Sequence, residues 1–131
     1  MKVQKTRDVE LQTVTMEGSQ GCQVRWLLSR DDGAPTFAMR QFEVEPGGFT
    51  PRHHHPYEHE VYVLEGEGEI LENDQPHRIS AGDVILVKPD EIHQFRNKGD
   101  SSLKFLCLIP NSGDMRQGAA TPECRSVESA K

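Results

Sequence analysis

Residues 51–60, "PRHHHPYEHE", hold four of the six histidines of the chain. In an extended strand, side chains two residues apart point to the same face, so His53 and His55 should project together while His54 points away. His59 begins the next alternating stretch, after a proline that should turn the chain. Neutral imidazole is a good ligand for transition metals. Two imidazoles from one strand and one from the next can therefore converge on a single ion.

A histidine-rich surface loop is the alternative interpretation of this stretch. A remnant of an affinity tag is disfavoured, because the cluster is internal and strand-like sequence follows it directly. A further ligand from a distant strand would favour a preorganised metal site. The candidate is His93 in "KPDEIHQFRN", which should begin a strand and share a face with Phe95 and Asn97.

Composition predicts one domain and excludes some partners. The chain has 131 residues, of which 34% are hydrophobic, and 21 acidic against 15 basic residues give a net charge of -6. This balance argues against a nucleic-acid or anionic-membrane partner, which would require a basic face. No apolar run approaches the roughly 20 residues of a membrane span, and the N-terminal residues do not resemble a signal peptide.

The cysteines predict a reducing compartment. Cys22, Cys107 and Cys124 are an odd number and lie far apart in the sequence. This pattern is typical of free thiols in a cytoplasmic protein rather than of a disulfide framework.

Alternation of apolar and polar residues predicts an all-β sandwich or barrel. Short turn signals rich in Gly, Pro, Asn and Asp separate the alternating stretches, and no helical period is found before residue 110. The expected strands are 9–14, 22–29, 36–45, 50–54, 59–65, 67–72, 76–79, 83–88, 93–97 and 103–109. Residues 111–131 are poor in large apolar side chains and are expected to form a mobile tail or a short terminal element. A tail that exchanges onto a partner subunit is the alternative.

The motifs in this strand pattern resemble those of the cupins, which are small double-stranded β-helix (jelly-roll) barrels. The first cupin motif is G-x5-H-x-H-x3,4-E-x6-G. Here the sequence reads Gly47-x5-His53-x-His55-x3-His59-x6-Gly66, which meets every spacing.

The second cupin motif is G-x5-P-x-G-x2-H-x3-N. Gly82 and Asn97 stand at the required distances from His93, whereas the proline is displaced by one position to Pro89 and the inner glycine is absent. The resemblance covers residues 35–109. It implies a single cupin domain over residues 1–110, with its metal-binding core at 35–109.

The glutamate position of the first motif is occupied by His59. Glu60 fits the longer permitted spacer, but it then leaves only five residues before Gly66, so His59 is preferred and Glu60 is the alternative ligand. The resemblance thus implies one divalent transition metal per chain, held by His53, His55, His59 and His93.

The metal expected from the resemblance differs from the one that ligand chemistry favours. The sequence is similar to bacterial cupins with four-histidine manganese sites, which implies Mn or Fe. Ligand chemistry alone would not select Mn, which binds nitrogen weakly, so Zn, Ni and Cu stay open.

A pocket is expected beside the metal. Arg40 and Phe42 share a mostly apolar face, where Arg40 either points into the pocket or is a solvated edge residue or part of a structural ion pair. Phe105, Cys107 and Ile109 share a face of the last strand and should lie near the open side of the metal. For Cys107, a role as a small buried side chain is favoured over a catalytic role.

The function expected from these features is a metal-dependent, oxygenase-type enzyme. Four neutral ligands leave a charge of +2 on the ion and two positions of an octahedron, which suits an anionic chelating substrate or peroxide. The alternatives are a non-catalytic cupin that binds or senses a metal or metabolite, and an isomerase or epimerase. Acid–base chemistry is less favoured, because no carboxylate is convincingly placed on the inner face.

Assembly is expected to follow the family. Small cupins commonly pair through strands that precede the barrel, so the resemblance implies a homodimer with residues 8–29 at its interface. A monomer would need these strands to cover its own sheet.

Overall fold

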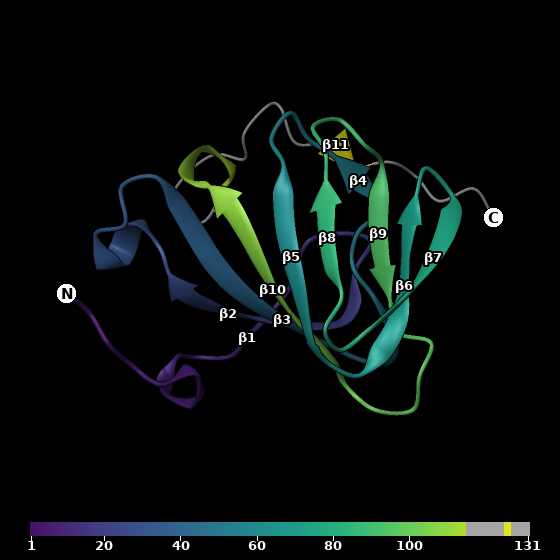
Figure 1. The fold of residues 1–131 in the computed structure, drawn as a ribbon, viewed down its shortest axis with the longest axis horizontal. Helices are drawn as coiled ribbons and strands as arrows, with labels where there is room; N and C mark the ends of the chain where they lie inside the picture. Colours follow the sequence, from purple (N-terminus) through teal and green to yellow (C-terminus); the bar gives the residue numbers. More distant parts are fainter. Residues whose placement is uncertain (115–124, 127–131) are drawn as a thin grey trace.

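The computed structural model describes residues 1–114 and 125–126, and it consists almost entirely of strands (Figure 1). Three single turns of 3-10 helix, η1 (Thr6–Asp8), η2 (Arg30–Asp32) and η3 (Asn111–Gly113), lie between or beside the strands. The strands are β1 (Gln12–Thr13), β2 (Gln20–Leu28), β3 (Phe37–Phe49), β4 (His53–His54), β5 (His59–Glu65), β6 (Glu67–Glu72), β7 (Gln75–Ser80), β8 (Val84–Val87), β9 (His93–Arg96), β10 (Leu103–Pro110) and β11 (Arg125–Ser126).

The strands form one antiparallel sheet that curls into a jelly-roll barrel (Figure 1). Its main path runs β11-β4-β9-β3-β10-β5-β8, while β2 pairs with β3 and β6 pairs with both β7 and β9. The predicted all-β jelly-roll fold is therefore confirmed. In this topology β9, which carries His93, pairs with β4, which carries His53, although the two strands are distant in sequence.

Strand β5 shows how alternation builds the barrel. His59, Val61 and Val63 are buried, whereas the side chains between them are exposed. The inner face of the curl continues into a core that includes Val44, Phe105 and other side chains almost fully removed from water. Burial of such apolar surface is the main stabilising contribution to the fold.

The predicted boundary between the strands at 36–45 and 50–54 was wrong. The turn expected after residue 45 is absent, and β3 runs on to Phe49 through Gly47, whose φ is +81°. The strand bends there without losing its partner, since Gly47 N–H donates to Asn97 O (3.1 Å) and Asn97 N–H donates to Gly48 O (3.0 Å). A Cβ at Gly48 would lie 2.7 Å from Gln20 O, so only glycine fits this close approach of strands.

Asn97, the last residue of the second motif, serves the fold. Its side-chain amide donates to Val44 O and Ser101 O, both at 2.8 Å, and its Oδ1 accepts from Gly99 N–H at 2.9 Å. Buried polar groups with full sets of partners of this kind hold a turn in one conformation. Asn97 therefore fixes the turn from β9 to β10.

The N-terminal strands extend the sheet of their own chain, because β2 pairs with β3 and β1 pairs with β2. Their expected role in a homodimer interface stays a prediction. Most of the expected tail, including Cys124, lies outside the described residues; β11 pairs with β4. Cys22 and Cys107 are free and buried. Within the described residues, no helix has the length and apolar character needed to cross a membrane.

Candidate functional site

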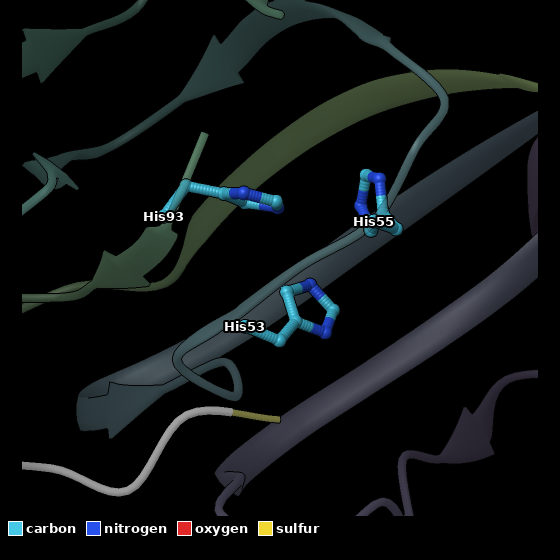
Figure 2. Close-up of side chains that lie close together, drawn as sticks. All are labelled: His53, His55 and His93. Atoms are coloured by element: carbon cyan, nitrogen blue, oxygen red, sulfur yellow. The ribbon is translucent and has the colours of Figure 1, made fainter. Parts of the chain in front are cut away.

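Four histidines from three strands and one turn meet inside the barrel. His53 in β4 is the register partner of His93 in β9, and His55 follows β4 directly. These three offer nitrogen atoms that all lie within 4.8 Å of one another, and Figure 2 shows their rings converging on one space. The His59 ring is centred 4.4 Å from that of His55 and 5.1 Å from that of His93. The predicted remote ligand is thus beside the cluster of residues 53–59.

Each of these rings has a buried nitrogen without a hydrogen-bond partner among the described residues. The atoms are Nδ1 of His53 and Nε2 of His55, His59 and His93. A buried polar atom left without a partner costs about 1–3 kcal/mol, and native structures contain few of them. Four such atoms in neighbouring rings would find a partner in a cation, and neutral nitrogen donors of this kind fit a transition metal.

The opposite nitrogens of three rings have partners that fix the ring orientation. His55 Nδ1 lies 2.7 Å from Tyr57 O, and His93 Nδ1 lies 2.8 Å from Glu91 O. A carbonyl accepts only from a protonated nitrogen, so in the neutral rings Nε2 keeps its lone pair for an ion. His59 Nδ1 instead lies 3.1 Å from Cys107 Sγ.

The environment keeps all four imidazoles neutral. Burial, followed by repulsion from His93, lowers the pKa of His53 to about 2 and that of His55 to about 4. Burial likewise lowers the pKa of His59, where the Arg40 guanidinium adds to the effect, and the pKa of His93. Neutral imidazole is the form that binds a metal.

A cavity of about 320 Å³ opens beside the histidines. His53, His59 and His93 stand at one side of it. Aromatic side chains form much of the remaining wall, and part of the N-terminal segment, residues 12–16, borders it. The aromatic lining residues are Trp26, Phe42, Tyr57, Phe95 and Phe105.

Arg40 points into this cavity rather than to a solvated edge. Its Nη2 donates to Cys107 Sγ at 3.0 Å, while its Nε is buried without a partner among the described residues. The guanidinium carbon lies 4.8 Å from the Phe42 ring centroid and 5.4 Å from that of Trp26, which are cation–π distances. Arg40 thus brings a fixed positive charge to a pocket that is partly lined by aromatic rings.

The other predicted residues divide into two groups. Phe42, Phe105 and Cys107 line the cavity, whereas Ile109 is buried in the core and is not among the described lining residues. Glu60, the alternative ligand, is exposed and follows the buried His59 on the opposite face of β5.

Sequence reasoning missed part of the cavity lining. Trp26, Phe95 and residues 12–16 border it without having been assigned there. Phe95 shares the strand face of His93, and this shared face could have identified it as a lining residue. Trp26 is the register partner of Arg40 across β2 and β3, a pairing that no local pattern reveals.

Comparisons with known proteins agree with this architecture. The family model described as "Cupin domain" matches residues 40–109. Protein SchB of Streptomyces halstedii is 37% identical over 108 residues, which cover 81% of this chain and 78% of that protein. An oxalate-binding protein of Thermotoga maritima is 34% identical over 99 residues, covering 72% and 80%. The solved structure of the polyketide cyclase RemF from Streptomyces resistomycificus aligns with a TM-score of 0.86 and 31% identity over 100% of this chain and 88% of that one.

Proposed function

The chain belongs to the cupin family, and we propose that it is a metal-dependent enzyme acting on a flat, anionic substrate that carries adjacent ketone or phenol oxygens. One observation carries this proposal: four buried histidine nitrogens without partners stand beside an aromatic cavity that contains a fixed guanidinium. The proposed ligands are His53, His55, His59 and His93. The proposed ion is one divalent metal per chain, Mn or Fe.

The charge of the site supports an anionic substrate. Among the described residues, the cluster that could hold a metal consists of histidines, with no carboxylate ligand. Four neutral ligands would leave the full +2 charge of the ion, and Arg40 adds a further positive charge in the same cavity. A substrate oxygen that carries negative charge is therefore favoured between the ion and the guanidinium.

The volume and lining of the cavity support a small, flat substrate. Its volume of about 320 Å³ is at the small end of ligand pockets, which span roughly 300–1,000 Å³. The rings of Phe42 and Phe105 are stacked with centroids 5.4 Å apart, and that of Phe95 lies 4.3 Å from Phe105. Aromatic walls of this kind favour a planar conjugated group through stacking.

The preferred reaction class is ring closure of a poly-β-ketone chain. The RemF structure, which matches the whole of this chain, is described as a polyketide cyclase. A divalent metal held by the four histidines would supply a Lewis acid that polarises carbonyl oxygens. The residues of this chain would orient the substrate: Arg40 pairs with the oxyanion, and Phe42 and Phe105 contact the conjugated chain and exclude water.

Oxygenase chemistry is the second candidate. It is favoured by the all-nitrogen ligand set, which would leave room at the ion for a chelating substrate or dioxygen. Oxygen consumption separates the two candidates, because ring closure by loss of water consumes no dioxygen. Binding without turnover is a further outcome, and the oxalate-binding relative makes oxalate a suitable probe for it.

The first test is the metal content of the tag-free protein. We expect about one transition ion per chain in the wild type, and loss of the ion in His93→Ala and in His59→Ala. His54→Ala is the matched control, because His54 lies in the same segment but outside the cluster. Oxalate and acetylacetone, which both bind metals as bidentate anions, should then shift the visible spectrum of the cobalt-loaded protein. A wild type that takes up no ion even after reconstitution would contradict the proposal.

A further inference from the structure

The Cys107 sulfur lies between a cavity cation and a histidine of the cluster. Cys107 is 1% exposed, and its Sγ is 3.0 Å from Arg40 Nη2 and 3.1 Å from His59 Nδ1. This position follows from the sheet, since β10 lies between β3 and β5 and places Cys107 opposite Arg40 on one side and Val61 on the other. The sulfur can therefore contact side chains from both neighbouring strands.

The role of this sulfur follows from the two nitrogens of His59. His59 is 6% exposed, and its Nε2 is buried without a partner among the described residues. A neutral imidazole has one N–H and one lone pair, so a lone pair at Nε2 for a metal requires the proton to be on Nδ1. A buried N–H without an acceptor would be costly. Cys107 Sγ is the partner that the structure shows for this nitrogen.

In two other histidines, the acceptor for the Nδ1 hydrogen is a backbone carbonyl. His55 and His93 each have a backbone carbonyl next to Nδ1, from Tyr57 and Glu91 respectively. Partners of this kind fix the tautomer and orientation of a ligand, and their loss typically costs 10–100-fold in metal affinity. For His59 that partner is a side chain, which a single substitution can remove.

We propose that Cys107 is a positioning residue of the metal centre. Its sulfur accepts the Nδ1 hydrogen of His59 and so presents the Nε2 lone pair to the ion. Arg40 donates a second hydrogen bond to the same sulfur and is itself held over the Phe42 and Trp26 rings. The three side chains Arg40, Cys107 and His59 thus form one hydrogen-bonded chain from the cavity to the metal. This inference rests on the proposed metal site.

Cys107→Ala and Cys107→Ser test the inference together. Alanine removes the acceptor, whereas the serine hydroxyl retains one. We expect Cys107→Ala to raise the dissociation constant for cobalt about 10–100-fold, measured by competition with a chromophoric chelator. Its cobalt visible spectrum should also change, because the orientation of one ligand changes. Cys107→Ser should remain close to the wild type in both measurements.

Cys22→Ala is the matched control for lost packing. Cys22 is 3% exposed, and its thiol donates to Phe49 O at 2.9 Å. The substitution removes the same sulfur from the same barrel without touching a histidine. It should lower thermal stability about as much as Cys107→Ala does, while its cobalt affinity and spectrum stay unchanged.

The outcomes separate this inference from the metal proposal. If the wild type binds cobalt and Cys107→Ala binds it equally well with the same spectrum, the positioning role is wrong and the metal site stands. The same holds if Cys107→Ser is as impaired as Cys107→Ala. If the wild type binds no cobalt, the proposed metal site itself fails, and this inference fails with it.

Discussion

The two halves of the histidine cluster are held in different ways. His55 and His93 direct Nδ1 to backbone carbonyls, and His55 is also stacked on the Tyr57 ring at 3.9 Å. His59 instead directs Nδ1 to the side chain of Cys107. Backbone partners are set by the fold, whereas side-chain partners depend on particular residues. Substitutions of neighbouring side chains should therefore leave the orientation of His55 and His93 unchanged. Substitution of Cys107 should change the orientation of His59.

The largest expected effect is that of pH on the metal-free protein. In the unfolded chain each histidine has a pKa of about 6.5, whereas burial lowers the pKa to about 2 for His53 and about 4 for His55. Below pH 6.5 the unfolded state therefore binds more protons than the folded state, and the free energy of unfolding falls as the pH falls. For each affected histidine, the free energy of unfolding falls by about 1.4 kcal/mol for each pH unit below 6.5.

Denaturant unfolding of the metal-free protein at pH 7, 6 and 5 measures this loss. His53→Ala should show a shallower pH dependence, by about one proton. Nuclear magnetic resonance titration compares the individual histidines. As the pH falls, His55 should become protonated at a higher pH than His53, because the Tyr57 carbonyl favours the protonated form of His55. Stability that is constant between pH 7 and pH 5 would contradict the neutral state of the cluster.

A smaller effect is expected from Arg40→Met, which removes the charge at the cavity end of the Arg40–Cys107–His59 chain. A hydrogen bond to a charged group contributes about 1.5–3 kcal/mol, so binding of oxalate to the metal-loaded protein should weaken about tenfold to a hundredfold. Metal content should persist, because Arg40 is not a ligand. The measurement is titration of the cobalt spectrum with oxalate.

Arg25→Met is the control for Arg40→Met. Arg25 lies in the same sheet and contacts Glu43 at 3.4 Å, but it does not line the cavity. Its loss should leave oxalate affinity unchanged. Equal weakening in both variants would show that overall charge, rather than the position of Arg40, controls anion binding.

The sequence was most informative where a residue's place depends on local pattern. Alternation placed His59 on the buried face of β5, and motif spacing linked it to His93. Alternation predicts which face of a strand a side chain lies on, but not how far along the strand the cavity extends. Ile109 therefore shares a face with Phe105 and Cys107 yet lies opposite Ala38, further along β10, and does not border the cavity.

Long-range pairing set the rest of the site. Residues 12–16 border the cavity because β1 pairs with β2, and the strand predicted over 9–14 does not by itself reveal this partner. Gly47 and Gly48 form a typical turn sequence, yet contacts with Asn97 keep them within a bent strand. Both features depend on a partner that is distant in the sequence.

The smallest expected effect is that of Glu60→Gln. This variant tests which face of β5 supplies the metal ligand. Glu60 is exposed, whereas the preceding His59 is buried, so adjacent residues give opposite predictions. Elemental analysis should find the same ion content in Glu60→Gln as in the wild type, while His59→Ala loses the ion. Oxalate should also bind Glu60→Gln with unchanged affinity. If Glu60→Gln lost metal and His59→Ala kept it, the ligand would be the carboxylate, and β5 would have to present its other face to the barrel, which would also expose the buried Val61 and Val63.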